Sequence, residues 1–78
     1  MPERSPVILV VDDEGSSRRL LAALLQADAY EVLAAASAPE ALERLQEQRP
    51  DLVLTDGMMP GVSGFELAAR LAKKGFAV

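Results

Sequence analysis

The sequence contains no cysteine and no histidine. The first absence excludes disulfides, thiolate metal sites and cysteine nucleophiles, and the second removes the commonest general base and the commonest zinc ligand. The longest apolar run near the N-terminus, Val7 to Val11, is far too short to cross a membrane, and residues 1–6 show no signal-peptide pattern. These absences predict a cytoplasmic protein with no membrane contact.

Clusters of basic residues are also absent. The chain has 8 basic and 12 acidic residues and a net charge of -4. Nucleic acids and anionic membranes require Lys and Arg to neutralise their phosphates, so we expect neither as a direct partner. The chain is 78 residues long and 50% hydrophobic, although only 4% aromatic. Such a composition is typical of one small, folded, aliphatic-rich domain.

Two unbroken apolar runs and one weaker run predict three β-strands. Residues 7–11 and 52–55 lack polar alternation, which is typical of parallel strands buried on both faces. Residues 31–36 are richer in alanine, a poor β-former, and their position between two helical patterns supports a strand there.

Three segments with helical spacing follow these strands. The first is expected to begin at a Ser16 or Ser17 cap, the second at a capping box from Ser37 to Glu40, and the third near Ser63, with Gly75 as its C-cap. Their predicted apolar faces are Leu20, Leu21, Leu24 and Leu25 in the first, Ala41, Leu42 and Leu45 in the second, and Phe65, Ala68 and Leu71 in the third.

Alternation of strands and helices predicts an α/β fold with a parallel sheet and helices on both of its faces. Asp12 and Asp13 follow the first strand, and Asp56 follows the third. Ligands of such sheets bind beyond the carboxyl ends of the strands, so these carboxylates converge if the two strands are neighbours. Carboxylate oxygens suit Mg²⁺, and a carboxylate beside Mg²⁺ can attack phosphorus to form an aspartyl phosphate.

These residues are open to other interpretations. Acidic side chains at strand ends also serve as solvated turn or helix-capping groups. Nucleotide binding is disfavoured because neither G-x-x-x-x-G-K-[ST] nor G-x-G-x-x-G follows a strand. A phosphatase that resembles the haloacid dehalogenases is disfavoured as well, since those enzymes have D-x-D where this chain has Asp12 and then Glu14.

Two segments, VILVVDDE at residues 7–14 and PDLVLTDGMMPGVSG at residues 50–64, resemble the signatures of bacterial response-regulator receiver domains. This resemblance implies a flavodoxin-like sheet of strand order 2-1-3, with Asp56 as the phosphoacceptor. It also implies that Asp13 and Asp56 bind Mg²⁺ directly, that Asp12 acts mainly through water, and that the Met58 backbone carbonyl completes the ligands. The phosphoryl donor would be a sensor histidine kinase, and the chain itself would not be an enzyme.

The resemblance spans residues 1–78 as one partial receiver domain, which contains about three βα units and lacks the fourth and fifth. The Ser or Thr and the Lys that those units carry in the family have no counterpart in this chain. Two functional hypotheses therefore stand: a Mg²⁺-dependent phosphoacceptor in a phosphorelay, and a dimerisation or docking module that works without phosphorylation.

The third strand is expected to form an exposed sheet edge, which favours association with a second copy. Two third strands could pair around a two-fold axis into a six-stranded sheet, or the tail Phe76–Val78 could be exchanged between copies. Alternatively, the chain is a fragment of a longer regulator, and no dimer is then required.

Overall fold

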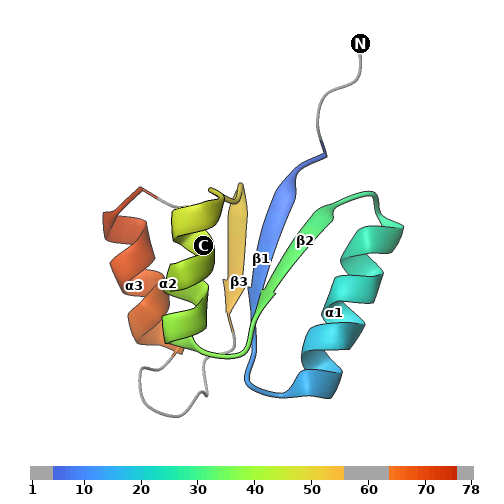
Figure 1. Cartoon of the computed structure of the whole chain (residues 1–78), viewed down its shortest axis with the longest axis horizontal. Helices are drawn as coiled ribbons and strands as arrows, with labels where there is room; N and C mark the ends of the chain where they lie inside the picture. Colours follow the sequence, from blue (N-terminus) through green and yellow to red (C-terminus); the bar gives the residue numbers. More distant parts are fainter. Residues whose placement is uncertain (1–4, 56–63, 76–78) are drawn as a thin grey trace.

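A computed structural model of the chain describes residues 5–55 and 64–75. Three strands and three helices alternate as β1 (Val7–Val11), α1 (Gly15–Ala27), β2 (Glu31–Ala35), α2 (Ala38–Glu47), β3 (Leu52–Thr55) and α3 (Gly64–Lys73). The strands form one parallel sheet of order β2-β1-β3, which confirms the predicted 2-1-3 order and the flavodoxin-like α/β class. Figure 1 shows α1 on one face of the sheet and α2 and α3 on the other.

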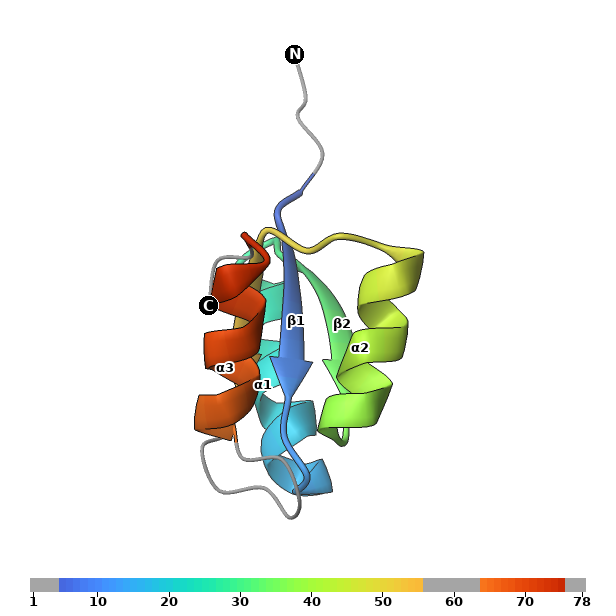
Figure 2. The same cartoon turned by 90° about the vertical axis from the view of Figure 1, so that its left-hand side faces the viewer.

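Strand β1 occupies the centre of the sheet, and all five of its residues are buried. Neighbouring strands cover its two edges and helices cover its two faces, which explains why its sequence is apolar without alternation. Figure 2, viewed from the α2 and α3 side, shows β1 running behind the gap between these helices. Strands β2 and β3 flank β1 and are only partly buried.

The main core lies between the sheet and helices α2 and α3. Small side chains let α2 approach closely, since Ala38 and Ala41 are both buried. In α3 the buried residues are Leu67 and Leu71, one helical turn apart, and Ala68 is half-buried. The sequence analysis named Leu71 and Ala68 but missed Leu67. The Phe65 side chain lies outside the described part of the structure.

Helix α1 differs from the prediction in two respects. Its N-cap is Glu14, whose carboxylate accepts a hydrogen bond from the Ser17 N–H at 2.9 Å, so Ser16 and Ser17 lie inside the helix. Its apolar stripe is only half used, because Leu21 and Leu25 are half-buried whereas Leu20 is 61% and Leu24 57% exposed. The helix packs mainly on β2 and β1, which leaves these two leucines on its outer side.

Helix α2 begins with the predicted cap, and its side chains hold the end of β2. The Ser37 hydroxyl accepts from the Glu40 N–H at 3.2 Å, while the Glu40 carboxylate accepts from the Ala36 N–H at 2.6 Å. The reciprocal bond of the capping box thus falls one residue earlier than in the usual pattern. The Arg44 Nε donates to the Ala34 carbonyl at 3.1 Å. These bonds position the peptide groups on both sides of Ala35.

Helix α3 ends at Lys73, and the predicted glycine, Gly75, lies in the turn that follows. Gly75 has φ +89°, a left-handed conformation that glycine adopts without strain, and its N–H donates to the Ala72 carbonyl at 3.1 Å. Ser63, the predicted start of this helix, lies outside the described residues. Within the helix, the Glu66 carboxylate accepts from the Arg70 Nη2 at 2.6 Å.

Candidate functional site

Asp12 directly follows β1 and is the only buried charged side chain in the described ranges 5–55 and 64–75, with 8% exposure. Its N–H donates to the Ala35 carbonyl at 3.1 Å, which extends the pairing of β1 with β2 by one residue. Its Oδ1 accepts from the Glu14 N–H at 2.9 Å. A buried charged group is costly without hydrogen-bond partners, and the bond from the Glu14 N–H supplies one to the Asp12 carboxylate. The backbone bond to Ala35 fixes Asp12 at the end of the central strand.

Asp13 is exposed, but hydrogen bonds fix the peptide groups on both sides of it. The carbonyl of Asp12 accepts from the Arg18 Nη1 at 2.8 Å, and the N–H of Glu14 is bonded to Asp12 as described above. Sequence reasoning placed Arg18 outside the apolar stripe of its helix and gave it no role. No sequence signal identifies this contact, because it depends on how α1 docks beside β1.

The carboxyl ends of β1 and β3 lie level with each other. Val11, the last residue of β1, is the Cα partner of Thr55, the last residue of β3. The predicted site residues Asp56 and Met58 come after Thr55 and lie outside the described residues. The structure therefore brings Asp12 and the end of β3 to one edge of the sheet, as the strand order predicted.

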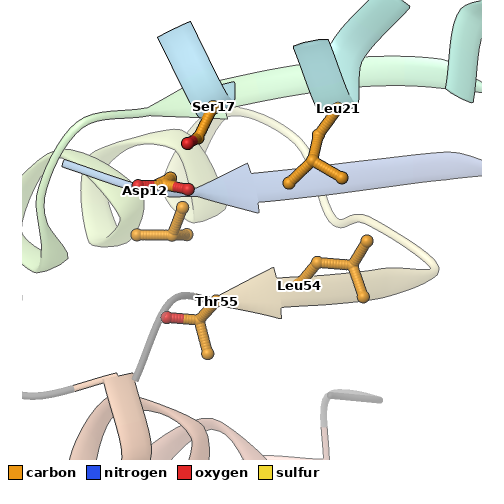
Figure 3. Close-up of a pocket in the computed structure, with 6 residues that line it drawn as sticks. Asp12, Ser17, Leu21, Leu54 and Thr55 are labelled. Atoms are coloured by element: carbon orange, nitrogen blue, oxygen red, sulfur yellow. The ribbon is translucent and has the colours of Figure 1, made fainter. Parts of the chain in front are cut away.

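A pocket of about 330 Å³ opens at this edge, between α1 and the sheet. Figure 3 shows Asp12, Ser17 and Thr55 toward the carboxyl ends of the strands, and Leu21 and Leu54 further along them. Sequence analysis treated Ser17 as a helix cap and Thr55 as an ordinary strand residue, and so missed both as lining residues. The only sequence signals for a role in the pocket were that Ser17 lies near the start of a predicted helix and that Thr55 precedes the predicted nucleophile Asp56.

The electrostatics of the turn favour negative charge. The Ser17 N–H, followed by the Ser16 N–H, lowers the pKa of the Glu14 carboxyl below its ordinary value of 4.5. Unpaired N–H groups at the start of α1 favour an ionised carboxylate there. Glu14 therefore adds to the negative charge that Asp12 and Asp13 carry beside the pocket.

The polar side chains around the pocket all offer oxygen atoms as possible metal ligands. They are the Asp12 carboxylate and the Ser17 and Thr55 hydroxyls, with the exposed Asp13 next in the chain. Oxygen ligands suit a hard divalent cation such as Mg²⁺ better than zinc or copper, which favour nitrogen and sulfur ligands. Within residues 5–55 and 64–75 no three acidic side chains lie close enough to form a complete metal site. The third predicted carboxylate, Asp56, falls outside these ranges.

None of the helices that the structure describes is both long and apolar enough to span a membrane.

Comparison with known proteins links this geometry to one family. Residues 8–78 match the family model of the response regulator receiver domain. The chain is 44% identical over 66 residues to the phosphate regulon transcriptional regulatory protein PhoB of Pseudomonas aeruginosa, an alignment that covers 85% of this chain and 29% of that protein. It is 47% identical over 64 residues to the response regulator PleD of Caulobacter vibrioides, covering 82% of this chain and 14% of that protein.

Solved structures show the same fold. The chemotaxis protein CheY4 of Vibrio cholerae matches with a TM-score of 0.84 and 35% identity, over 91% of this chain and 59% of that one. The response regulator TrrA of Thermotoga maritima, solved in complex with Mg²⁺-BeF, matches with a TM-score of 0.83 and 45% identity, over 88% of this chain and 60% of that one. The chain thus spans less than a third of the two curated relatives and about three-fifths of the two solved chains.

Proposed function

The chain belongs to the response-regulator receiver family, and from this premise we propose that it is a phosphoacceptor module of a two-component phosphorelay. Asp56 is the acceptor, and a sensor histidine kinase is the donor. The observation that carries this proposal is the register of β1 with β3, in which Val11 pairs with Thr55. This register ends β1 and β3 at the same edge of the sheet, which is where ligands of parallel sheets bind.

The proposed chemistry is a nucleophilic displacement at phosphorus. A carboxylate oxygen of Asp56 attacks, the bond from phosphorus to the kinase histidine breaks, and the imidazole nitrogen keeps the electron pair. The chain contains no histidine, so it can receive the phosphoryl group but cannot supply it. We also propose that the chain is a signalling module and not an enzyme, that it works in the cytoplasm, and that its excess of acidic residues disfavours nucleic acid as a partner.

We further propose a Mg²⁺ site at the same edge. Asp13 and Asp56 are its direct carboxylate ligands, the Met58 backbone carbonyl is a third, and Asp12 acts mainly through water. Support comes from the oxygen donors that surround the pocket and from the buried position of Asp12. When bound, Mg²⁺ supplies positive charge to the phosphoryl oxygens. The Glu14 N–H holds the Asp12 carboxylate in place, and the Glu14 cap fixes the start of α1 next to it.

Residues 1–78 correspond, in this proposal, to the first three βα units of a receiver domain. In the family, the Ser or Thr and the Lys that stabilise the phosphoryl oxygens belong to the fourth and fifth units.

A second candidate function rests on strand β3. Among the described strands β3 pairs with β1 alone, and its Leu52 and Leu54 are only half-buried. A strand at the edge of a sheet associates readily with strands of other chains. We propose that two copies pair through β3 around a two-fold axis and form a six-stranded sheet. Exchange of Phe76–Val78 is the other predicted route, and those residues lie outside the described part. Such a dimer could act as a binding module without phosphorylation.

Intact-mass spectrometry distinguishes the two functions. The chain is incubated with Mg²⁺ and acetyl phosphate, alongside Asp56→Asn and the control Asp28→Asn, which removes the same charge at the C-cap of α1. We expect a gain of one phosphoryl group in the wild type and the control, and none in Asp56→Asn. A folded chain that gains nothing would contradict the phosphoacceptor function and favour the binding module.

A further inference from the structure

Arg18 lies in the first turns of α1 but reaches back to the end of β1. Its side chain is half-buried, and its Nη1 donates to the Asp12 carbonyl at 2.8 Å across six positions of the sequence. Its own N–H donates to the Glu14 carbonyl at 3.0 Å, which fixes the base of the side chain. Arg19, the next residue, is exposed; its charge is the smallest of the causes that lower the pKa of Glu14, and the bond to the Asp12 carbonyl comes from Arg18 instead.

The hydrogen bond from Arg18 is one of two that fix the backbone on either side of Asp13. The Asp12 carbonyl belongs to the peptide group before Asp13, and the Glu14 N–H belongs to the peptide group after it. The first accepts from Arg18, and the second donates to the Asp12 Oδ1 at 2.9 Å. With both flanking peptide planes fixed, the two soft backbone dihedrals of Asp13 have little freedom. The direction of its Cβ is therefore set even though its side chain is exposed.

We infer that Arg18 is a positioning residue for the proposed cation site, acting through Asp13. The pairing of β1 with β2 ends at the Asp12 N–H, and the guanidinium then supplies the donor for the Asp12 carbonyl. A guanidinium suits this role because it is always charged, planar and able to form strong charge-assisted hydrogen bonds. The inference rests on the proposed Mg²⁺ site and adds a residue outside its ligand set.

The positioning effect can be separated from the effect of charge. A cation near the site repels Mg²⁺, so removing its charge alone would strengthen binding. Removing the tether frees the Asp13 backbone and would weaken binding. Arg19 offers a matched control, because Arg19→Met removes the same charge from the same helical turn without removing a bond to the Asp12 carbonyl.

The test is a Mg²⁺ titration of the ¹⁵N-labelled full chain at constant ionic strength, followed through the amide resonances of Asp13 and Glu14. We expect Arg18→Met to bind Mg²⁺ about 10-fold more weakly than the wild type, in the range measured for residues that orient metal ligands. Arg19→Met should bind as tightly as the wild type or slightly more tightly. Arg18→Lys, which keeps the charge and one donor group, should fall between the wild type and Arg18→Met.

A second readout needs no metal. In the metal-free chain, hydrogen exchange at the Glu14 amide should accelerate in Arg18→Met and stay unchanged in Arg19→Met, because only the first variant loosens the turn. If Arg18→Met does not fold, Arg18→Lys carries the same comparison. Equal Mg²⁺ affinity of the Arg18 and Arg19 variants would overturn the positioning role and leave the metal site standing. A folded wild type that binds no Mg²⁺ would overturn both.

Discussion

Val11 and Thr55 are paired at the last position of the β1–β3 ladder, so the two strands end at the same level. Asp12 follows the first of these residues and Asp56 the second. Because both strands end at the same edge of the sheet, and ligands of parallel sheets bind at that edge, a shared cation site is expected there. Asp12, Arg18 and Glu14 then determine how the turn after β1 is held.

Asp12→Asn should weaken Mg²⁺ binding without unfolding the chain. The amide oxygen can still accept from the Glu14 N–H, but the negative charge beside the pocket is lost. We expect a loss of affinity of about 10-fold or more, as for other groups that act around a metal without being its main ligands. Isothermal titration with Mg²⁺ measures it, with circular dichroism to monitor the fold. An unchanged affinity in the folded variant would argue against a role for Asp12.

The acidic cap of α1 should make stability depend on pH. Glu14 has a lowered pKa in the folded chain, so its ionised form stabilises the fold above the ordinary value of 4.5, and this contribution is lost as the pH falls through the folded pKa. Glu14→Gln should therefore be less stable than the wild type at pH 7, and the difference should shrink below pH 4.5. Urea unfolding at several pH values measures this, with the exposed Glu43→Gln as control. A difference independent of pH would contradict the role of the charge.

Two leucines on helices, Leu71 and Leu24, should differ sharply in how much they contribute to the free energy of unfolding. Leu71 is fully buried against the sheet, whereas Leu24 is 57% exposed on α1. Leu71→Ala should cost about 2–5 kcal/mol in the free energy of unfolding, through lost burial and the cavity that remains. Leu24→Ala should change it by less than about 0.5 kcal/mol in the monomer. Denaturant unfolding at low protein concentration compares the two variants, and equal losses would contradict the exposed position of Leu24 on α1.

Association through β3 should be sensitive to charge on that strand. Leu52→Lys puts a cation on the strand that we propose to pair with its copy, outside the lining of the pocket, and such charges block contact between strand edges. Sedimentation velocity over a range of concentrations should show a dimer for the wild type and a monomer for Leu52→Lys. Leu24→Lys, which places the same charge on α1, should behave as the wild type. The opposite pattern would assign the contact to α1, and a wild type that stays monomeric would remove the dimer.

How far the sequence determines the structure differs from one element to another. Strand β1 was identified because its apolar residues do not alternate, and the capping box at Ser37 was identified because its pattern is local. The cap of α1 was assigned wrongly to the serines, since Glu14 has a longer side chain that also reaches the Ser17 N–H. Local pattern does not decide between such competing caps.

The remaining differences come from tertiary packing. Helical spacing marks Leu20, Leu21, Leu24 and Leu25 as one stripe, but the position of α1 over β2 and β1 decides which of them are covered. The same docking brings Arg18 to the Asp12 carbonyl, a contact between residues whose sequence gives no sign of it. The acidic residues stay predicted site residues, and the strand order, which the sequence did predict, is what places Asp12 at the pocket by the end of β3.

The central claim is that Asp56 receives the phosphoryl group, and the most direct measurement locates the modified residue. The chain is treated with acetyl phosphate and Mg²⁺, reduced with borohydride, which converts an aspartyl phosphate to homoserine, and sequenced by tandem mass spectrometry. We expect homoserine at position 56 and at neither Asp12 nor Asp13, and none anywhere when Mg²⁺ is chelated. Homoserine at another aspartate, or unchanged aspartate at 56 in a folded chain, would contradict the account.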